Sequence, residues 1–285
     1  MTKTSDNENT LSRIADSLSR IADCAEQQTG MPPKRILQAL ADGGSYYRWR
    51  AAQAGGVLTA MAAAGESEKA EHLRGLQKQT DAVRDNTARF LSGKPAHNIL
   101  ISGARGCGKS SVMRAVLSGF AKKGGKLMET DGEGLAKLPF LLAALAQTKD
   151  AFIVFCDDLS FATESPPALV RSALEGSFFA DARVLIYATA NRRHLSRSMF
   201  SDADDIHPGE TEDEKLALAD RFGLSLRIYP PEVGEYEDIT ADWLHRYGIK
   251  PSPSLLRQAR AYADRRGGRS GRVAKQFALA AAAQK

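Results

Sequence analysis

Cysteine is scarce in this chain of 285 residues, where Cys24, Cys107 and Cys156 form an odd number at wide spacing. This pattern excludes a disulfide framework and the paired cysteine and histidine spacing of a structural zinc site. Long apolar runs are also missing, because the longest, residues 138–146, is much shorter than a membrane-spanning helix. The N-terminal residues are polar and lack the apolar stretch of a signal peptide. We therefore expect a cytoplasmic protein with reduced thiols.

Aromatic residues are few, at 7%, but the hydrophobic fraction of 43% and the charged fraction of 26% are ordinary for a globular protein. Disordered and collagen-like chains are thereby excluded. The formal net charge is +5 and is unevenly distributed, since residues 241–285 hold ten Lys and Arg but two acidic residues. Such a segment binds the phosphates of a nucleotide or a nucleic acid, or it forms a solvated helix face. The sequence leaves both interpretations open.

The hydrophobic pattern divides the chain into four segments. Apolar residues alternate at three- and four-residue spacing between Leu11 and Ile21, which predicts a short amphipathic helix. The next segment is rich in Ala, Leu, Gln, Arg and Glu without β-branched runs, and it is therefore predicted to be helical. The predicted segments are an N-terminal tail and amphipathic helix (1–33), a helical region leading into the core (34–92), an α/β domain (93–229) and a small all-helical domain (230–285).

Apolar runs of strand length alternate with helical segments in the α/β domain. This alternation predicts a parallel sheet with helical crossovers. After Pro230 and Pro231 the pattern becomes helical only, which makes this pair the best domain boundary. We expect an α/β fold with a five-stranded parallel sheet at residues 98–102, 127–130, 151–156, 184–189 and 224–229, followed by helices at about 233–247, 253–265 and 270–284.

The stretch that begins at Gly103 carries the strongest chemical signal. A glycine, four further residues, and then Gly108, Lys109 and Ser110 make the phosphate-loop (P-loop) pattern between a strand and a helix. Glycines allow backbone N–H groups to surround phosphates, and the following helix adds its N-terminal dipole. Lys109 is predicted to reach the β- and γ-phosphates of ATP, and Ser110 to bind Mg²⁺. The predicted nucleotide contacts are Gly103, Ala104, Arg105, Gly106, Cys107, Gly108, Lys109, Ser110 and Ser111.

Two acidic residues follow the strand predicted at residues 151–156. Ligands bind at the carboxyl ends of strands in doubly wound folds, so this pair is expected near the P-loop. Asp157 is predicted to hold Mg²⁺, and Asp158 to orient or deprotonate the attacking water. Asn191 follows another buried strand and is a candidate to bind the γ-phosphate or that water. A turn-forming asparagine at a strand end is the alternative.

These motifs together resemble a known family. The run ATANR at 188–192 is similar to the sensor-1 strand of AAA+ ATPases, DRFG at 220–223 to their arginine-finger box, notably in bacterial branch-migration motors, and SGRVA at 270–274 to their sensor-2 segment. With the P-loop and the run FIVFCDDLSF, they resemble a bacterial family of AAA+ ATP-binding proteins classed as a domain of unknown function. The resemblance covers about residues 45–285, and residues 1–40 lie outside it.

The resemblance implies roles for three residues outside the P-loop. Asn191 would be the polar sensor, Arg221 would reach the ATP of a neighbouring subunit in a homo-oligomer, and Arg272 would bridge the helical lid and the nucleotide. The alternative is that Arg221 and Arg272 are ordinary surface arginines of a basic protein. The implied strand order places the sensor strand between the P-loop strand and the strand that precedes Asp157. AAA+ enzymes commonly have Glu at the position of Asp158, and the shorter side chain here is compatible with slow hydrolysis.

The sequence thus favours a Mg²⁺-dependent ATPase that acts on an unidentified protein or nucleic-acid partner. A nucleotide-gated loader or DNA-binding module with little turnover is the alternative. A small-molecule kinase is disfavoured, because Asn191, Arg221 and Arg272 would then have no explanation. No membrane association is expected.

Overall fold

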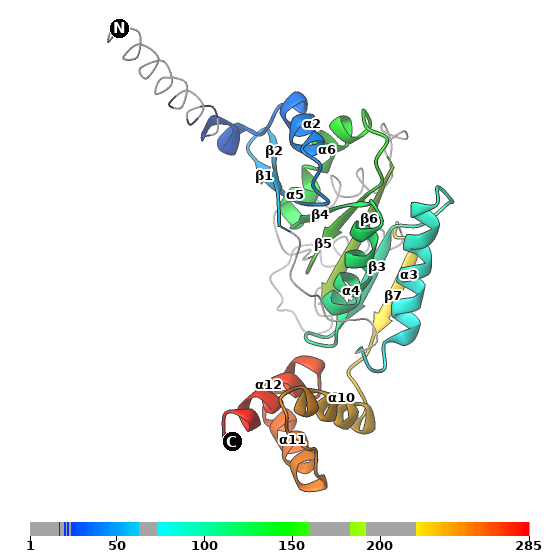
Figure 1. Cartoon of the computed structure of the whole chain (residues 1–285), viewed down its shortest axis with the longest axis vertical. Helices are drawn as coiled ribbons and strands as arrows, with labels where there is room; N and C mark the ends of the chain where they lie inside the picture. Colours follow the sequence, from blue (N-terminus) through cyan, green and yellow to red (C-terminus); the bar gives the residue numbers. More distant parts are fainter. Residues whose placement is uncertain are drawn as a thin grey trace, which may run out of the picture.

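The computed structural model describes residues 17, 20, 22, 24–62, 73–159, 183–191 and 221–284. Among them, a seven-stranded sheet with helices on both faces forms the body, and three C-terminal helices form a separate layer below it in Figure 1. The strand order is β2-β1-β4-β5-β6-β3-β7. The predicted α/β class is confirmed, with seven strands in place of the five expected.

The five predicted parallel strands are all present. They are β3 (Ile99–Gly103), β4 (Lys126–Thr130), β5 (Phe152–Cys156), β6 (Val184–Asn191) and β7 (Leu224–Ile228). Every neighbouring pair among them is parallel, so their carboxyl ends meet at one edge of the sheet. Strand β6 lies between β5 and β3, which is the predicted order. Asp157, Asn191 and the P-loop therefore lie at the same edge.

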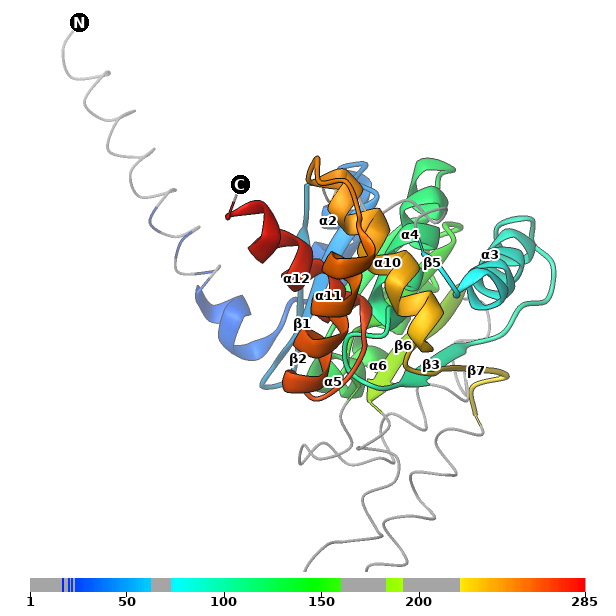
Figure 2. The ribbon, with the colours of Figure 1, turned by 90° about the horizontal axis from the view of Figure 1, so that it is seen from below.

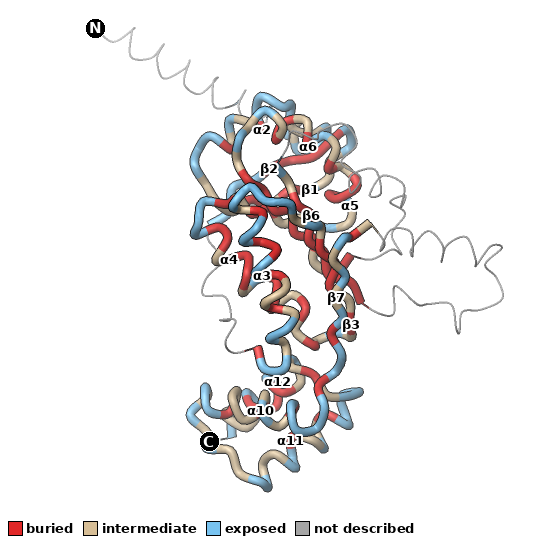
Figure 3. The backbone as a smooth tube through the Cα atoms, turned by 90° about the vertical axis from the view of Figure 1, so that its right-hand side faces the viewer, coloured by how far each residue is buried: buried red, intermediate tan, exposed pale blue. Residues whose placement is uncertain are grey.

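The sheet separates two hydrophobic cores. Side chains alternate along β5, so that Phe152 and Val154 point into one core while Ile153 and Phe155 point into the other. Figure 3 shows the buried backbone concentrated in the strands and on the helix sides that face them. The helices of the first core are α2 (Pro33–Ala41), α5 (Gly132–Ala136) and α6 (Leu138–Leu145), and those of the second are α3 (Gln77–Leu91) and α4 (Lys109–Lys122).

The helical structure predicted throughout residues 34–92 is wrong in one part, which forms an antiparallel hairpin of β1 (Tyr46–Ala52) and β2 (Gly55–Ala60). Along β1, Tyr47 and Trp49 are buried while the residues between and beside them are more exposed. A two-residue period of burial is typical of a strand. The strand was not predicted because the segment has few β-branched residues. Strand β1 pairs in parallel with β4, so the hairpin extends the sheet by two strands.

Gly56→Ala is expected to destabilise the fold, because the hairpin packs against the body through Trp49. A Cβ added at Gly56 would lie 2.2 Å from Cζ2 of Trp49, whose ring is fully buried and whose Nε1 donates to the Gly134 carbonyl. The ring has no room to move, so we expect a loss of roughly 1–3 kcal/mol of unfolding free energy. Gly119→Ala in α4 is the control, since nothing lies within 4 Å of its added Cβ. Chemical denaturation compares the two variants, and equal stability would contradict this packing.

The last segment forms three helices around a core of their own. Helices α10 (Val233–Arg246), α11 (Pro253–Arg265) and α12 (Gly271–Ala282) agree with the predicted ones. Tyr236, Leu244 and Phe277 are buried among small alanine side chains between them. The side chains of Ser252 and Ser270 accept backbone hydrogen bonds that cap α11 and α12. We call these three helices the lid, which Figures 1 and 2 place beyond the edge where the parallel strands end.

The N-terminal part of the chain is only partly described. The amphipathic helix predicted between Leu11 and Ile21 lies for the most part outside the described residues, whereas residues 24–29 are helical. Across the described ranges, no helix is both long enough and apolar enough to cross a membrane.

Candidate functional site

The P-loop joins β3 to α4 at the edge of the sheet that faces the lid. Gly106 and Gly108 have φ angles of 78° and 101°, in the left-handed region that favours glycine. Space is also restricted at Gly108, where a Cβ would lie 2.6 Å from Cδ1 of Leu76. Helix α4 begins at Lys109, so its N-terminal partial positive charge lies next to the loop. This backbone arrangement is suited to an anion.

The side chain of Lys109 is buried inside the loop. Its Nζ donates to the carbonyl oxygens of Gly103 and Ala104 and to Oδ1 of Asn191, each at 2.9 Å. Burial lowers the pKa of Lys109. Three oxygen atoms therefore hold the ammonium group at the junction of the P-loop and β6.

Asp157 accepts three hydrogen bonds at the end of β5. Its Oδ1 accepts from Ser110 Oγ at 2.5 Å and from Thr189 Oγ1 at 2.8 Å, and its Oδ2 accepts from the Arg114 guanidinium at 2.9 Å. Ser110 and Asp157 thus present adjacent oxygen atoms, the ligand type that Mg²⁺ prefers. Within the described ranges, no group of three or more His, Cys, Asp or Glu side chains is placed to hold a metal ion. A Mg²⁺ ion at Ser110 and Asp157 would therefore take its remaining ligands from phosphate and water.

Asp158 has an unusual backbone conformation. Its φ is +60°, the only positive value at a non-glycine residue in the described part of the chain. The left-handed conformation costs most residues with a Cβ roughly 1–2 kcal/mol, and Asp adopts it more readily because its short side chain can hydrogen-bond locally. The Asp158 N–H donates to Thr189 Oγ1 at 2.8 Å, and the Asp158 carboxylate accepts from the side-chain amide of Asn191. Asn191 therefore connects the second acidic residue to Lys109.

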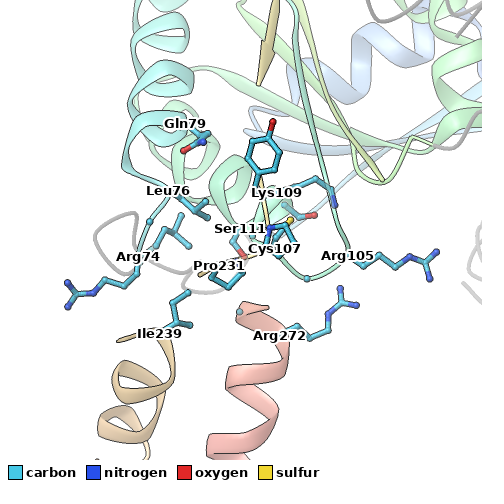
Figure 4. A pocket seen from close by; sticks show the side chains of 18 of the residues that line it. Arg74, Leu76, Gln79, Arg105, Cys107, Lys109, Ser111, Pro231, Ile239 and Arg272 are labelled. Carbon is cyan, nitrogen blue, oxygen red and sulfur yellow. The ribbon is translucent and has the colours of Figure 1, made fainter. Parts of the chain in front are cut away.

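A pocket of about 950 Å³ lies between the P-loop, the start of α3 and the lid. The P-loop and the two acidic residues line it with polar groups. Leu73, Leu76, Ile239 and Trp243 add apolar surface, beside charged side chains such as Glu235 and Lys275. Figure 4 shows Leu76 and Ile239 on one side of the P-loop and the charged side chain of Arg272 on the other. The volume is within the range of small-molecule sites, and the two surfaces suit a ligand with an apolar and an anionic end.

The lid touches the body directly at this pocket. The backbone N–H of Arg272, at the start of α12, donates to the Gly106 carbonyl at 3.3 Å. A Cβ added at Gly106 would lie 3.0 Å from Ser270 Oγ, so the lid packs closely on the loop. At the opposite side, Arg74 forms an ion pair with Asp242 of α10, with N and O 2.7 Å apart. The start of α12 therefore lies against the P-loop.

The model of the family described as "Protein of unknown function (DUF815)" matches residues 44–285. The chain belongs to this family. No curated protein matches the sequence. The family description names no activity for this DUF815 chain.

Solved structures show which fold this DUF815 chain has. A RuvB mutant from Thermotoga maritima is 17% identical over 72% of this chain and 62% of its own, with a TM-score of 0.51. The AAA domain of FIGL-1 in complex with ADP is 22% identical over 78% of this chain and 74% of its own, with a TM-score of 0.53. The Aeropyrum pernix ORC1 protein in complex with DNA is 14% identical over 73% of this chain and 59% of its own, at 0.53. The predicted AAA+ fold is thereby confirmed, although this chain spans less than two thirds of the RuvB chain.

Most residues predicted for the site lie together in this DUF815 chain. Residues 105–111, both acidic residues, Asn191 and Arg272 border the pocket. Gly103 and Ala104 contribute their carbonyl groups to Lys109. Arg221 is not one of the described residues that line the pocket. It is half-buried and lies in the segment just before β7. The roles predicted for these residues stay predictions.

Two residues of the site, Arg114 and Thr189, were not predicted from the sequence. Arg114 lies four residues after Ser110 and thus on the same face of α4, a spacing that could have revealed it. Thr189 stands two positions before Asn191 on β6 and gave no signal of its own. Cys107 was predicted as a nucleotide contact, and its thiol donates to the Ala104 carbonyl at 2.7 Å. Burial raises the pKa of Cys107, which favours a structural thiol over a reactive one.

Proposed function

We propose that this chain binds ATP together with Mg²⁺ in the pocket between the P-loop and the lid. The observation that carries the proposal is the position of Lys109, Ser110 and Asp157 around a loop with left-handed glycines. The acceptors that now hold Lys109 Nζ are neutral oxygens. Phosphate oxygens are charged and form stronger hydrogen bonds with an ammonium group, so we expect them to replace some of these contacts.

The mixture of polar and apolar groups in the pocket lining supports a nucleotide over a simple phosphate. The P-loop would bind the β- and γ-phosphates, and Arg272 would add a cation from the lid. Leu76, Ile239 and Trp243 would contact the base, whose flat apolar surface suits them. The AAA domain of FIGL-1, which shares this fold, is in complex with ADP, and this supports a nucleotide in the pocket.

We further propose that the bound ATP is hydrolysed. Asp158 would accept a proton from the attacking water or orient it, and Asn191 would hold Asp158 in place through its side-chain amide. Mg²⁺, held by Ser110 and Asp157, would neutralise charge on the phosphates. Arg221 does not border the pocket of its own chain within the described residues, so it would act on the ATP of a neighbouring subunit in a homo-oligomer.

Titration calorimetry with Mg-ATP tests the proposed binding. We expect a saturable heat of association that weakens when EDTA removes Mg²⁺. The fluorescence of Trp243 gives a second readout, since this residue borders the pocket, whereas Trp49 in strand β1 is fully buried. The proposal fails if the folded wild-type protein shows neither a heat of association with Mg-ATP nor a change in Trp243 fluorescence.

A nucleotide-gated DNA-binding module is the second candidate function. Arg257, Arg265 and Arg266 are exposed on α11 and just after it, which gives the lid a basic surface. Thermotoga maritima RuvB is a Holliday junction branch migration motor, and the Aeropyrum pernix ORC1 protein is in complex with DNA, so DNA is the first nucleic acid to test. Affinity measured with a non-hydrolysable ATP analogue should fall steeply with salt, because phosphate contacts release counterions. Stimulation of turnover by DNA favours a motor, and unchanged turnover favours gated binding.

A further inference from the structure

The pair Asp157 and Asp158 raises a geometrical question about the proposed hydrolysis. An aspartate carboxylate is one methylene shorter than a glutamate carboxylate, so it needs a different backbone path to reach the same place. The chain takes such a path, because Asp158 is in the left-handed conformation. Conformations of this kind persist where surrounding groups hold them, often at functional sites.

Thr189 is the residue that holds this conformation. Its Oγ1 accepts the Asp158 N–H at 2.8 Å, and its carbonyl oxygen accepts the Leu159 N–H at 2.6 Å. Both N–H groups belong to the turn that leaves β5, so Thr189 fixes that turn at two consecutive peptide units. Thr189 itself is rigid, since it is 1% exposed and paired within the sheet between β5 and β3.

The same hydroxyl group also reaches the first acidic residue. Thr189 Oγ1 donates its hydrogen to Asp157 Oδ1 at 2.8 Å while it accepts from Asp158 N–H. The hydroxyl group thus donates one hydrogen bond, to Asp157, and accepts one, from the N–H of Asp158. A valine side chain of similar shape would lose both bonds, whereas a serine would keep both.

The contacts continue from the turn to the P-loop. The Asp158 carboxylate accepts from Asn191 Nδ2, and Asn191 Oδ1 accepts from Lys109 Nζ at 2.9 Å. The left-handed backbone therefore turns the short carboxylate toward the groups that border the proposed γ-phosphate position. Without the Thr189 hydroxyl, the turn loses the bond that favours this conformation.

We propose that Thr189 is a positioning residue for the paired aspartates. Its hydroxyl holds Asp158 in the left-handed conformation, and this conformation brings an aspartate to the water-activating position that a glutamate would otherwise occupy. The inference rests on the proposed ATP hydrolysis and assigns no bond-making role to Thr189. It acts through Asp158 and, by its second bond, keeps Asp157 beside Ser110.

Thr189→Val and Thr189→Ser test this role by separating binding from turnover. In Thr189→Val we expect kcat to fall by about 10- to 100-fold, since a misplacement near 1 Å costs about that much. The dissociation constant for Mg-ATP should change by less, because the P-loop contacts remain. Thr189→Ser should restore most of the turnover. Thr189→Ala is the second variant if the valine form does not fold, and thermal unfolding checks each protein.

Thr130→Val is the matched control. Thr130 also ends a parallel strand, and its hydroxyl donates to the Trp49 carbonyl at 3.1 Å, away from the pocket. This variant should keep the wild-type kcat. The inference is overturned if Thr189→Val or Thr189→Ala turns over at the wild-type rate, or if Thr189→Ser is as slow as they are. A wild-type protein that binds no Mg-ATP would instead refute the proposed function itself.

Discussion

Replacing Lys109 with methionine is expected to weaken Mg-ATP binding by at least about 100-fold, because hydrogen bonds to charged groups contribute roughly 1.5–3 kcal/mol each. Methionine keeps the apolar stem of the side chain and removes the ammonium group. In the unbound protein, that group holds the Gly103 and Ala104 carbonyls and the Asn191 side chain together. The substitution therefore removes both the proposed phosphate ligand and an internal connection of the loop.

Calorimetry with Mg-ATP measures this effect, and a thermal unfolding curve shows whether the loop connection also matters for stability. Lys122→Met is the matched control, since Lys122 is exposed in the last turn of the same helix, far along α4 from the P-loop. It should bind Mg-ATP like the wild type. Wild-type affinity in a folded Lys109→Met protein would contradict the assignment of the phosphate site.

Arg221→Ala is expected to bind Mg-ATP normally and to hydrolyse it about 10³-fold more slowly, the lower end of the effect of an arginine finger. Normal binding is expected because Arg221 is half-buried and does not border its own chain's pocket among the described residues. The loss of turnover is expected from the resemblance of residues 220–223 to an arginine-finger box. Removing it should leave every proposed nucleotide contact of that chain intact. Arg227→Ala is the control, because Arg227 is exposed on the neighbouring strand β7.

A mixing experiment shows whether Arg221 acts between subunits. Lys109→Met subunits cannot bind ATP in this proposal but still carry Arg221, whereas Arg221→Ala subunits keep an intact pocket. Mixing the two inactive proteins should restore part of the phosphate release, because one subunit then supplies what its neighbour lacks. If the mixture stays inactive while wild-type oligomers form and turn over, a role between subunits is refuted. Normal turnover of Arg221→Ala alone would refute any catalytic role.

The sequence was informative where one residue type is chemically required. The P-loop could be recognised because Gly106 and Gly108 need positive φ and because Lys109 follows them at a fixed spacing. Strands β3, β5 and β6 could be recognised because strands buried on both faces are largely apolar, as β5 is throughout. The lid helices were equally clear, with prolines at or before the starts of α10 and α11 and serine caps at the starts of α11 and α12.

The sequence was uninformative where the decisive partner is distant along the chain. The β1–β2 hairpin depends on a buried Trp49 and on the space at Gly56, neither of which follows from local propensity. The role inferred for Thr189 depends on its bonds to residues more than 30 positions earlier. The left-handed backbone of Asp158 is equally invisible in a sequence, because aspartate occurs in many conformations.

The backbone bond between Arg272 and Gly106 has a mechanical consequence. The three C-terminal helices share their own core and therefore form one packed unit. The unit is joined to the sheet by a short chain segment after β7 and by its contact with the P-loop, while α11 extends away from the sheet in Figure 1. A displacement of the Gly106 carbonyl would therefore act on the start of α12 directly and, through the shared core, on α10 and α11. If the unit turned about this contact, the far end of α11 would move farther than its start.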